Sequence, residues 1–469
     1  MHITAKIHNG VRAANTGIPM RHRGRPAAAD QKPSSRGFPD GGCSGAGFPA
    51  FLIAIYIRTR RSQIIFSTSQ KYQISQRMTS SELTLTPAAN GFGCTVTLPD
   101  YAKNDPSQLS DADFHKLYEA ALTYLVLVLP GLENLSPKSQ YLMTKRFDPS
   151  IPEPKGESGA GYGHGKEFRH TQSVLRKDGT SVKSQPQVQI LGQGVFAKGE
   201  PGNDNDEEIS LTHPSHTLFH KEPLSEKEIK DNHQTRFYRW HIDSALYDLS
   251  PPMITTLLGI KVPPATHSQT IDYDDGSGDK LTLTQGATCF VSGAAAYERL
   301  SDEEKEFALN TVVEYAPHPY IFISPAKAEK DGLTMVSEGL EKKFDELPEW
   351  EALKVKKLPM VWTNPVTKKH HLQVHGCCLY KLHTTEGGKT RTLELEAARE
   401  KVRSLMRPAI SPENVLAHSW TEGDLVIFFN RGVWHSVTGE FKGLNNGADE
   451  KRLMHQCNIA SGSDPITVK

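Results

Sequence analysis

The stretch EGDLVIFFNRGVWH, residues 422–435, combines two turns with one continuous apolar run. Turn-forming residues stand at Gly423 and at positions 430–432, and the run Leu425–Phe429 between them favours a buried strand. The chain then presents His435 directly after the second turn. Taken alone, a core strand followed by a surface histidine is the simplest interpretation. The same arrangement is also what the last ligand of a buried metal site requires.

Further strand-like segments lie on the N-terminal and C-terminal sides of this stretch, and several are short and bounded by Gly, Asn or Asp. They are residues 188–191, 280–284, 288–292, 371–382, 424–429 and 452–459. Short strands dominate the C-terminal two thirds of the chain, and helical patterns surround them. The sequence therefore predicts a mainly β protein with flanking helices, an antiparallel sandwich or jelly roll.

Four segments carry helix signals. Ser110 is a candidate N-cap for a helix that is expected to run on to Pro130 and Gly131. Pro137 suits the first position of a second helix. The capping box Ser301–Glu304 predicts a helix through about residue 313, and residues 393–406 have a charged amphipathic pattern. The polar segments 201–208 and 442–450 are expected to be loops.

The charge balance of the chain argues against two classes of partner. Lys plus Arg and Asp plus Glu are both 54, so the formal net charge is zero. This balance gives no electrostatic reason to expect nucleic acid or an anionic membrane as partner. The apolar run at residues 48–57 is about ten residues long, against the roughly 20 that span a bilayer. We therefore expect a cytoplasmic protein whose partner is a small molecule; its oligomeric state is left open.

The cysteines and the N-terminal segment suggest how the chain is organised. Six cysteines without any C-x-x-C pair disfavour a thiolate zinc site and suit buried free thiols in a reducing compartment. Residues 1–77 are rich in Arg, Gly, Ser and Pro, and we expect a poorly ordered extension there rather than a transit peptide. The folded part is expected to occupy residues 78–469.

A candidate metal-ligand pair lies in the stretch RFYRWHID, residues 236–243. His241 and Asp243 are two positions apart, so on a strand they point to the same face. With a distant histidine such as His435 they would complete a 2-His-1-carboxylate triad, which leaves three metal positions open for other ligands. Because the chain has 20 histidines, about one His-x-Asp pair is expected by chance, and the pair alone is weak evidence.

Two further residues strengthen this hypothesis. Arg452 follows His435 across a Gly- and Asn-rich loop, and Thr288 lies in a predicted strand. A 2-oxoacid that chelates a metal leaves its far carboxylate pointing into the protein, where an arginine can bind it with two charge-assisted hydrogen bonds. A threonine hydroxyl can assist. Arg452 alone could be an ordinary surface residue, and only the ordered set favours a functional site.

These motifs resemble the taurine dioxygenase-like branch of the Fe(II)/2-oxoglutarate-dependent oxygenases, over roughly residues 80–465. The strongest pieces are residues 240–243, 286–301 and 423–435. The resemblance implies a double-stranded β-helix, with an insertion near residues 326–375. It implies His241, Asp243 and His435 as catalytic iron ligands, and Thr288 and Arg452 as 2-oxoglutarate anchors. The cofactors implied are Fe(II), 2-oxoglutarate and O2, with ascorbate as a stimulant.

Within that branch, residues 235–252 are similar to the fungal xanthine dioxygenases, which oxidise xanthine to urate with release of succinate and CO2. The resemblance implies Gln456 and Asn458 as substrate contacts. Relatives that oxidise sulfonates carry a second arginine four positions after the first, where this chain has Gln456. A neutral amide suits a flat heterocycle with mixed donors and acceptors better than it suits a sulfonate. Both residues could also be ordinary polar residues of a strand.

Three alternatives stay open. The first is a same-family oxygenase acting on a sulfonate or other small carboxylate, with His455 or Lys451 as the cationic anchor. The second is a non-catalytic metal-binding jelly roll, which would predict a missing ligand. The third is a nucleic-acid demethylase, which the balanced charge disfavours. Four histidines have no assigned role: His164, His170, His213 and His216.

Overall fold

The structure is a computed structural model that describes residues 82–151, 180–439 and 451–469. These residues belong to one compact unit, Gln76–Lys469. The predicted extension 1–77, the loop 442–450, Cys43, His164 and His170 lie outside the described residues. Within the described ranges, none of the helices combines the length and the apolar character needed to cross a membrane.

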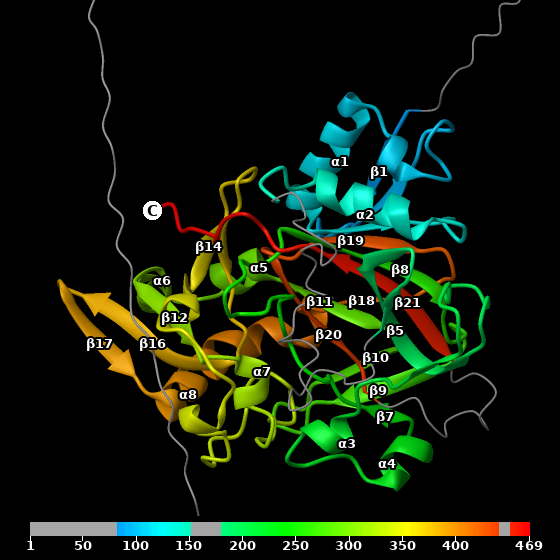
Figure 1. The fold of residues 1–469 in the computed structure, drawn as a ribbon. Helices are drawn as coiled ribbons and strands as arrows, with labels where there is room; N and C mark the ends of the chain where they lie inside the picture. The colour runs from blue at the N-terminus through cyan, green and yellow to red at the C-terminus, as the bar shows by residue number, and fades with distance from the viewer. Residues whose placement is uncertain (1–81, 152–179, 440–450) are drawn as a thin grey trace, which may run out of the picture. The chain divides into compact units, whose positions relative to one another are not determined.

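The largest sheet has nine strands, and the predicted buried strand lies in its centre (Figure 1). All five residues of β19 (Leu425–Phe429) are buried, and β3 and β8 pair with its two edges. The parallel pair β2–β3 is the exception to an otherwise antiparallel sheet. Its other strands are β1 (Thr84–Pro87), β2 (Cys94–Thr97), β3 (Val126–Leu129), β8 (Ile254–Lys261), β21 (Arg452–Asn458), β5 (Gln185–Phe196), β4 (Thr180–Val182) and β6 (Ile209–Leu211).

A second layer packs against this sheet. It contains β18 (Leu416–His418), β11 (Thr288–Ser292) and β20 (Val433–Val437), all antiparallel. Phe290 of β11 contacts Phe428 of β19, with ring centroids 5.2 Å apart, so the two layers share one apolar core. A further sheet contains β7 (Gln234–Thr235), β9 (Ser268–Asp272) and β10 (Lys280–Thr284). The predicted mainly β jelly roll is confirmed.

The remaining sheets lie beyond the jelly roll. One holds β12 (Thr311–Tyr315), β13 (Lys357–Pro359), β16 (Leu379–Glu386) and β17 (Lys389–Leu393). The other pairs β14 (Val361–Thr363) with β15 (His370–Leu372). The predicted insertion, residues 326–375, contributes β13, β14 and β15 and so supplies part of both sheets. That it is an insertion stays a prediction.

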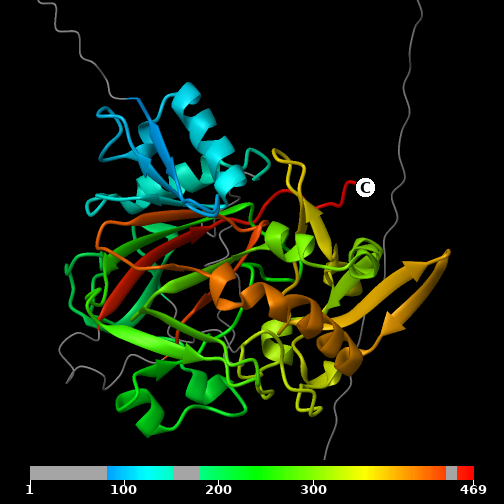
Figure 2. The ribbon, with the colours of Figure 1, turned by 180° about the vertical axis from the view of Figure 1, so that it is seen from behind.

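The first three predicted helix starts are confirmed, and the fourth helix begins two residues later than predicted. The hydroxyl of Ser110 accepts a hydrogen bond from Asp113 at the start of α1 (Asp111–Tyr124), and Pro137 opens α2 (Pro137–Arg146). The capping box at Ser301 opens α6 (Asp302–Leu309), and α8 is Leu395–Met406. Both views show α1 and α2 on the side of the large sheet away from β11 and β20 (Figures 1 and 2). The described residues also contain four short α-helices: α3 (His216–Phe219), α4 (Glu226–Lys230), α5 (Gly293–Glu298) and α7 (Pro319–Phe322).

Three predicted boundaries were wrong. The first helix ends at Tyr124, since residues 126–129 pair with β19 and with β2 instead of continuing to Pro130. The third helix ends at Leu309, because the β-branched run after it forms β12. The predicted strand 371–382 is interrupted between β15 and β16, where Gly376 lies so close to Leu333 that a Cβ would be 2.2 Å from its carbonyl oxygen.

Candidate metal and cosubstrate site

Backbone pairing places two of the predicted ligands opposite each other. Residues 237–241 run antiparallel to β20, and the bridge between them joins His241 to His435. The amide of each residue donates to the carbonyl of the other, with both distances 2.9 Å. Their imidazole rings consequently lie with centroids 4.0 Å apart. The edge of the second layer thus brings together two residues that are far apart in the sequence.

Asp243 completes a compact group of three possible ligands. The ligand atoms of His241, Asp243 and His435 all lie within 4.8 Å of one another. The Asp243 Oδ1 atom is 3.9 Å from His241 Nε2 and 3.8 Å from His435 Nε2. Two imidazole nitrogens and a carboxylate oxygen form the donor set of a facial triad that suits Fe(II). The structure therefore brings the three predicted ligand residues together.

The surroundings of the group also suit a metal ion. His241 Nδ1 lies 3.0 Å from the carbonyl oxygen of Arg239, so a proton on Nδ1 leaves Nε2 free to bind metal. The other carboxylate oxygen of Asp243, Oδ2, accepts hydrogen bonds from Thr255 at 2.7 Å and from Gln456 at 3.3 Å. These bonds hold Oδ1 toward the two imidazoles. The donor set and its orientation fit a bound Fe(II).

The electrostatics of the site favour neutral imidazoles. Burial lowers the pKa of His241 well below the usual histidine range, and the nearby His435 and Arg239 lower it further. Burial also lowers the pKa of His435, against the opposing effect of the Asp243 carboxylate. Because a protonated imidazole cannot bind a metal, these shifts keep both rings in the form that a metal ion needs.

The two predicted cosubstrate anchors also meet in the core. Thr288 is fully buried on β11, and Arg452 is 4% exposed at the start of β21. Arg452 Nη2 lies 3.5 Å from the Thr288 hydroxyl, which also accepts a hydrogen bond from the Trp420 indole at 3.1 Å. An arginine and a hydroxyl in this arrangement can bind one carboxylate. Trp420 was not predicted from the sequence.

The two predicted substrate residues follow Arg452 along β21. Arg452, Gln456 and Asn458 occupy alternate positions, apart from a register shift between Leu453 and Met454, and Gln456 reaches Asp243. Asn458 Oδ1 accepts a hydrogen bond from Gln189 Nε2 at 3.4 Å. The structure therefore brings Gln456 to the metal group and adds Gln189 beside Asn458.

The cations considered for an anionic substrate have other contacts. His455 lies between Met454 and Gln456 on β21, so its side chain points to the opposite face of the sheet from theirs. Its Nε2 is 2.9 Å from the Gly202 carbonyl oxygen. Lys451 forms an ion pair with Glu200 at 3.2 Å. Neither contact involves the metal group. Of the unassigned histidines, His213 contacts the Thr438 carbonyl oxygen at 2.6 Å and His216 is buried, and neither joins the group.

Two buried residues near the site were missed by the sequence reasoning. Arg239 precedes His241 by two positions, and its guanidinium is close enough to lower the pKa of both histidine ligands. His375 is fully buried, with its ring centroid 6.1 Å from that of His241. The alternation that marked His241 and Asp243 could have included Arg239. His375 lies in an irregular segment whose pattern gives no comparable signal.

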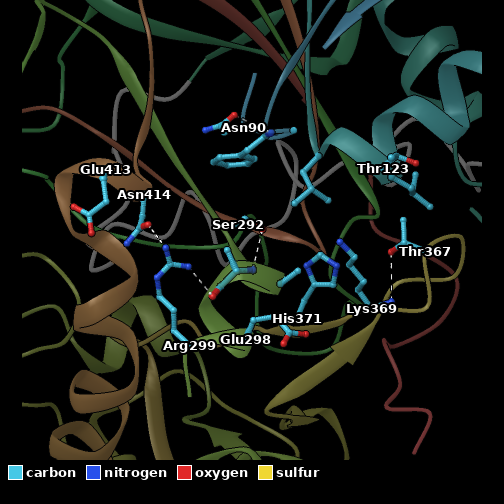
Figure 3. Close-up of a pocket in the computed structure, with 16 residues that line it drawn as sticks. Asn90, Thr123, Ser292, Glu298, Arg299, Thr367, Lys369, His371, Glu413 and Asn414 are labelled. Carbon is cyan, nitrogen blue, oxygen red and sulfur yellow. Dashed lines mark hydrogen bonds between the residues drawn. The ribbon is translucent and has the colours of Figure 1, made fainter. Parts of the chain in front are cut away.

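A separate cavity of about 440 Å³ contains none of the three candidate ligands (Figure 3). Its walls come from residues 90–92 and 122–125, from α5, and from the segments 367–371 and 413–414. Arg299 spans one side of it and donates hydrogen bonds to Asn414 and to the Ala295 carbonyl oxygen. The residues that line this cavity do not include a candidate ligand or a predicted cosubstrate anchor, so we do not assign the reaction to the cavity.

Comparison with known proteins agrees with the arrangement of the site. Residues 187–458 match the family model described as taurine catabolism dioxygenase TauD, TfdA family, a span that includes every predicted site residue. The chain is 46% identical to an alpha-ketoglutarate-dependent xanthine dioxygenase of Emericella nidulans, over 81% of this chain and 97% of that protein. It is 44% identical to the protein of the same description from Schizosaccharomyces pombe, over 80% and 86% of the two chains.

Solved structures of low sequence identity also match. One is a putative alpha-ketoglutarate-dependent taurine dioxygenase from Burkholderia xenovorans, with 15% identity, a TM-score of 0.47, and coverage of 82% of this chain and 92% of that chain. The family model spans more than half of this chain, and the xanthine dioxygenase relatives align over most of its length. The chain belongs to the TauD, TfdA family of dioxygenases.

Proposed function

We propose that this chain is an Fe(II)- and 2-oxoglutarate-dependent dioxygenase that hydroxylates xanthine. The balanced reaction takes xanthine, 2-oxoglutarate and O2 to urate, succinate and CO2. The observation that carries the proposal is the convergence of His241, Asp243 and His435 with a neutral amide, Gln456, in contact with the same carboxylate. The relatives described as xanthine dioxygenases, 44% and 46% identical over most of their length, support the same substrate.

The three ligand residues would hold the iron, which when bound supplies activation of O2 coupled to the oxidative decarboxylation of 2-oxoglutarate. The protein's own part at this point is orientation. Thr255 and Gln456 hold one oxygen of Asp243, and the Arg239 carbonyl holds the His241 ring. These contacts orient two of the three donors, His241 and Asp243, without help from the substrate.

Arg452 and Thr288 are the proposed anchors of 2-oxoglutarate. Both are buried, so a carboxylate bound there would be shielded from water, which strengthens the charge-assisted pair. The Trp420 indole donates to the Thr288 hydroxyl, which leaves the hydroxyl proton available for a carboxylate oxygen. The two anchors would therefore fix the position of the far carboxylate.

Gln456 and Asn458 are the proposed substrate contacts. A primary amide offers both a donor and an acceptor, which matches the alternating N–H and carbonyl groups at the edge of a purine-dione. Gln189 donates to Asn458 and so orients its amide. The hydrogen bond from Gln456 to Asp243 brings these two residues side by side, which supports a substrate contact next to a metal ligand.

We further propose that the enzyme acts in the cytoplasm on a small molecule, without nucleic acid or a membrane as partner, and that ascorbate stimulates it. The five described cysteines are all buried and free, which agrees with a reducing compartment. Ascorbate would serve to keep the iron in its reduced form. Activity measured with and without ascorbate tests this last point.

The test of the function is a coupled product assay. Protein purified without O2 is mixed with Fe(II), ascorbate, 2-oxoglutarate and xanthine, and urate absorbance and succinate are followed after O2 is admitted. Urate and succinate formed one to one, and lost in His241→Ala, is the expected result. Succinate that xanthine does not increase would refute the purine substrate while retaining the oxygenase class. Bound iron without succinate for any tested substrate would favour a non-catalytic metal site.

A further inference from the structure

The guanidinium of Arg239 is buried without a matching anion. Arg239 is 5% exposed, and its Nε and Nη1 atoms have no hydrogen-bond acceptor among the described residues. None of the ion pairs found in the described part of the chain includes it. Arg399, which is 2% exposed, differs in having an anion beside it: it forms an ion pair with Glu341 at 2.6 Å, although its Nε and Nη2 atoms also lack a hydrogen-bond acceptor among the described residues. An arginine keeps its charge at every physiological pH, so a buried one calls for a partner.

The surroundings of Arg239 supply only weak compensation. Its guanidinium carbon lies 5.3 Å from the centroid of the Tyr320 ring, 5.7 Å from that of Tyr238 and 5.9 Å from that of Phe219. Aromatic faces attract a cation, but they do not accept hydrogen bonds in the plane of the guanidinium. Two donors in that plane, Nε and Nη1, therefore remain without an acceptor in the described part of the chain, and a planar group with oxygen or nitrogen acceptors would match them.

A short series of ring contacts connects Arg239 to the metal group. The Tyr320 ring lies 5.8 Å from the ring of His375, which in turn lies 6.1 Å from the ring of His241. His375 is fully buried, and its Nδ1 atom has no partner among the described residues. Two buried side chains with partnerless nitrogen atoms, one a guanidinium and one an imidazole whose Nε2 contacts Cys378, thus lie beside the candidate iron site.

We propose that Arg239, together with His375, forms a second substrate-recognition element that binds the carbonyl-bearing edge of the substrate. The inference rests on the proposed function. Xanthine carries two carbonyl oxygens and an adjacent ring nitrogen that loses its proton readily, and a planar guanidinium matches such an edge with two parallel hydrogen bonds. Arg239 and Gln456 lie on different elements, so the substrate would have two separate contacts, which would fix its orientation.

The test compares Arg239→Gln and Arg239→Lys with the matched control Arg399→Lys, which keeps its ion pair. The dissociation constant for xanthine is measured by anaerobic equilibrium dialysis with Fe(II) and 2-oxoglutarate present. Unsubstituted purine, which has no carbonyl oxygen, is measured as a competitive inhibitor. We expect at least tenfold weaker xanthine binding in both Arg239 variants, an unchanged inhibition constant for purine, and no change in either value for Arg399→Lys.

Equal losses of xanthine and purine binding, or xanthine affinity within twofold of the wild type, would overturn the inference. Circular dichroism and 2-oxoglutarate binding check that each variant is folded. If Arg239→Gln does not fold, Arg239→Lys decides the question, because it keeps the buried charge but not the two parallel bonds. Failure of the wild type to oxidise xanthine would refute the proposed function instead, and the two failures are therefore distinguishable.

Discussion

Replacing Thr255 by valine is expected to weaken Fe(II) binding without unfolding the protein. Thr255 is fully buried on β8, and its hydroxyl donates to Asp243 Oδ2 at 2.7 Å. Valine keeps the shape and removes the donor, which leaves Gln456 at 3.3 Å as the remaining side-chain donor to that oxygen. A hydrogen bond to a charged group contributes about 1.5–3 kcal/mol, and loss of such a supporting contact reduces metal affinity roughly 10- to 100-fold.

The neighbouring residue on the same strand provides the matched control. Thr256 is equally buried but points to the opposite face, where its hydroxyl contacts Gln140 Nε2 at 3.2 Å and Thr144 Oγ1 at 2.7 Å. Thr256→Val should therefore lower the free energy of unfolding by about 1–3 kcal/mol and leave Fe(II) affinity unchanged.

The assay is anaerobic titration of metal-free protein with Fe(II), read by calorimetry, together with denaturant unfolding of each variant. The reasoning would be refuted if Thr255→Val bound Fe(II) as tightly as the wild type. It would also be refuted if both variants weakened metal binding equally, because the effect would then be a general loss of stability.

The remaining predictions concern the anchors and an ion pair at the surface. Arg452→Gln should raise the KM for 2-oxoglutarate at least tenfold, since it removes a charged hydrogen bond worth about 1.5–3 kcal/mol; an unchanged KM in steady-state assays would remove Arg452 from the anchor. Gln456→Ala should raise the KM for xanthine more than that for 2-oxoglutarate, and equal changes would indicate damage to the metal group. The hydrogen bond from Arg407 lowers the pKa of Asp275 in the folded protein. The Asp275 carboxylate therefore stabilises the fold at pH values above its unfolded pKa of about 3.9. This stabilisation is lost progressively as the pH falls below that value. Asp275→Asn should consequently be less stable than the wild type at pH 6 and should approach it below about pH 3 in denaturant unfolding; a constant difference would contradict this.

The parts of the fold that could be predicted are those where local pattern and long-range pairing agree. The strands at 280–284 and 288–292 have the predicted bounds, because their residues favour strands and also find strand partners. Residues 126–129 were misassigned to a helix. Their apolar run fits either structure, and the pairing with β19, almost 300 residues later in the sequence, decides between them.

The candidate site could be predicted where it depends on the alternation of side chains between the two faces of a strand. His241 and Asp243 share a face because they are two positions apart. His435 was predicted as the third ligand because it follows the turn at residues 430–432, which the sequence indicates with Asn430 and Gly432. The partner of Asp243 on β8, Thr255, could not be inferred, since nothing local identifies which strand lies beside residues 237–243. His375 depends on the path of an irregular segment that only the folded chain reveals.

The backbone bridge between His241 and His435 makes the spacing of these two ligands independent of how many residues connect them. Two amide–carbonyl bonds fix the spacing of these residues at the value of a β ladder, independently of the loops that connect them. Segments of the intervening chain other than those that hold Asp243, Thr255 and Thr288, such as residues 326–375, can therefore change in length without moving these two ligands. Substrate preference can vary through those segments without the ligands having to be positioned anew.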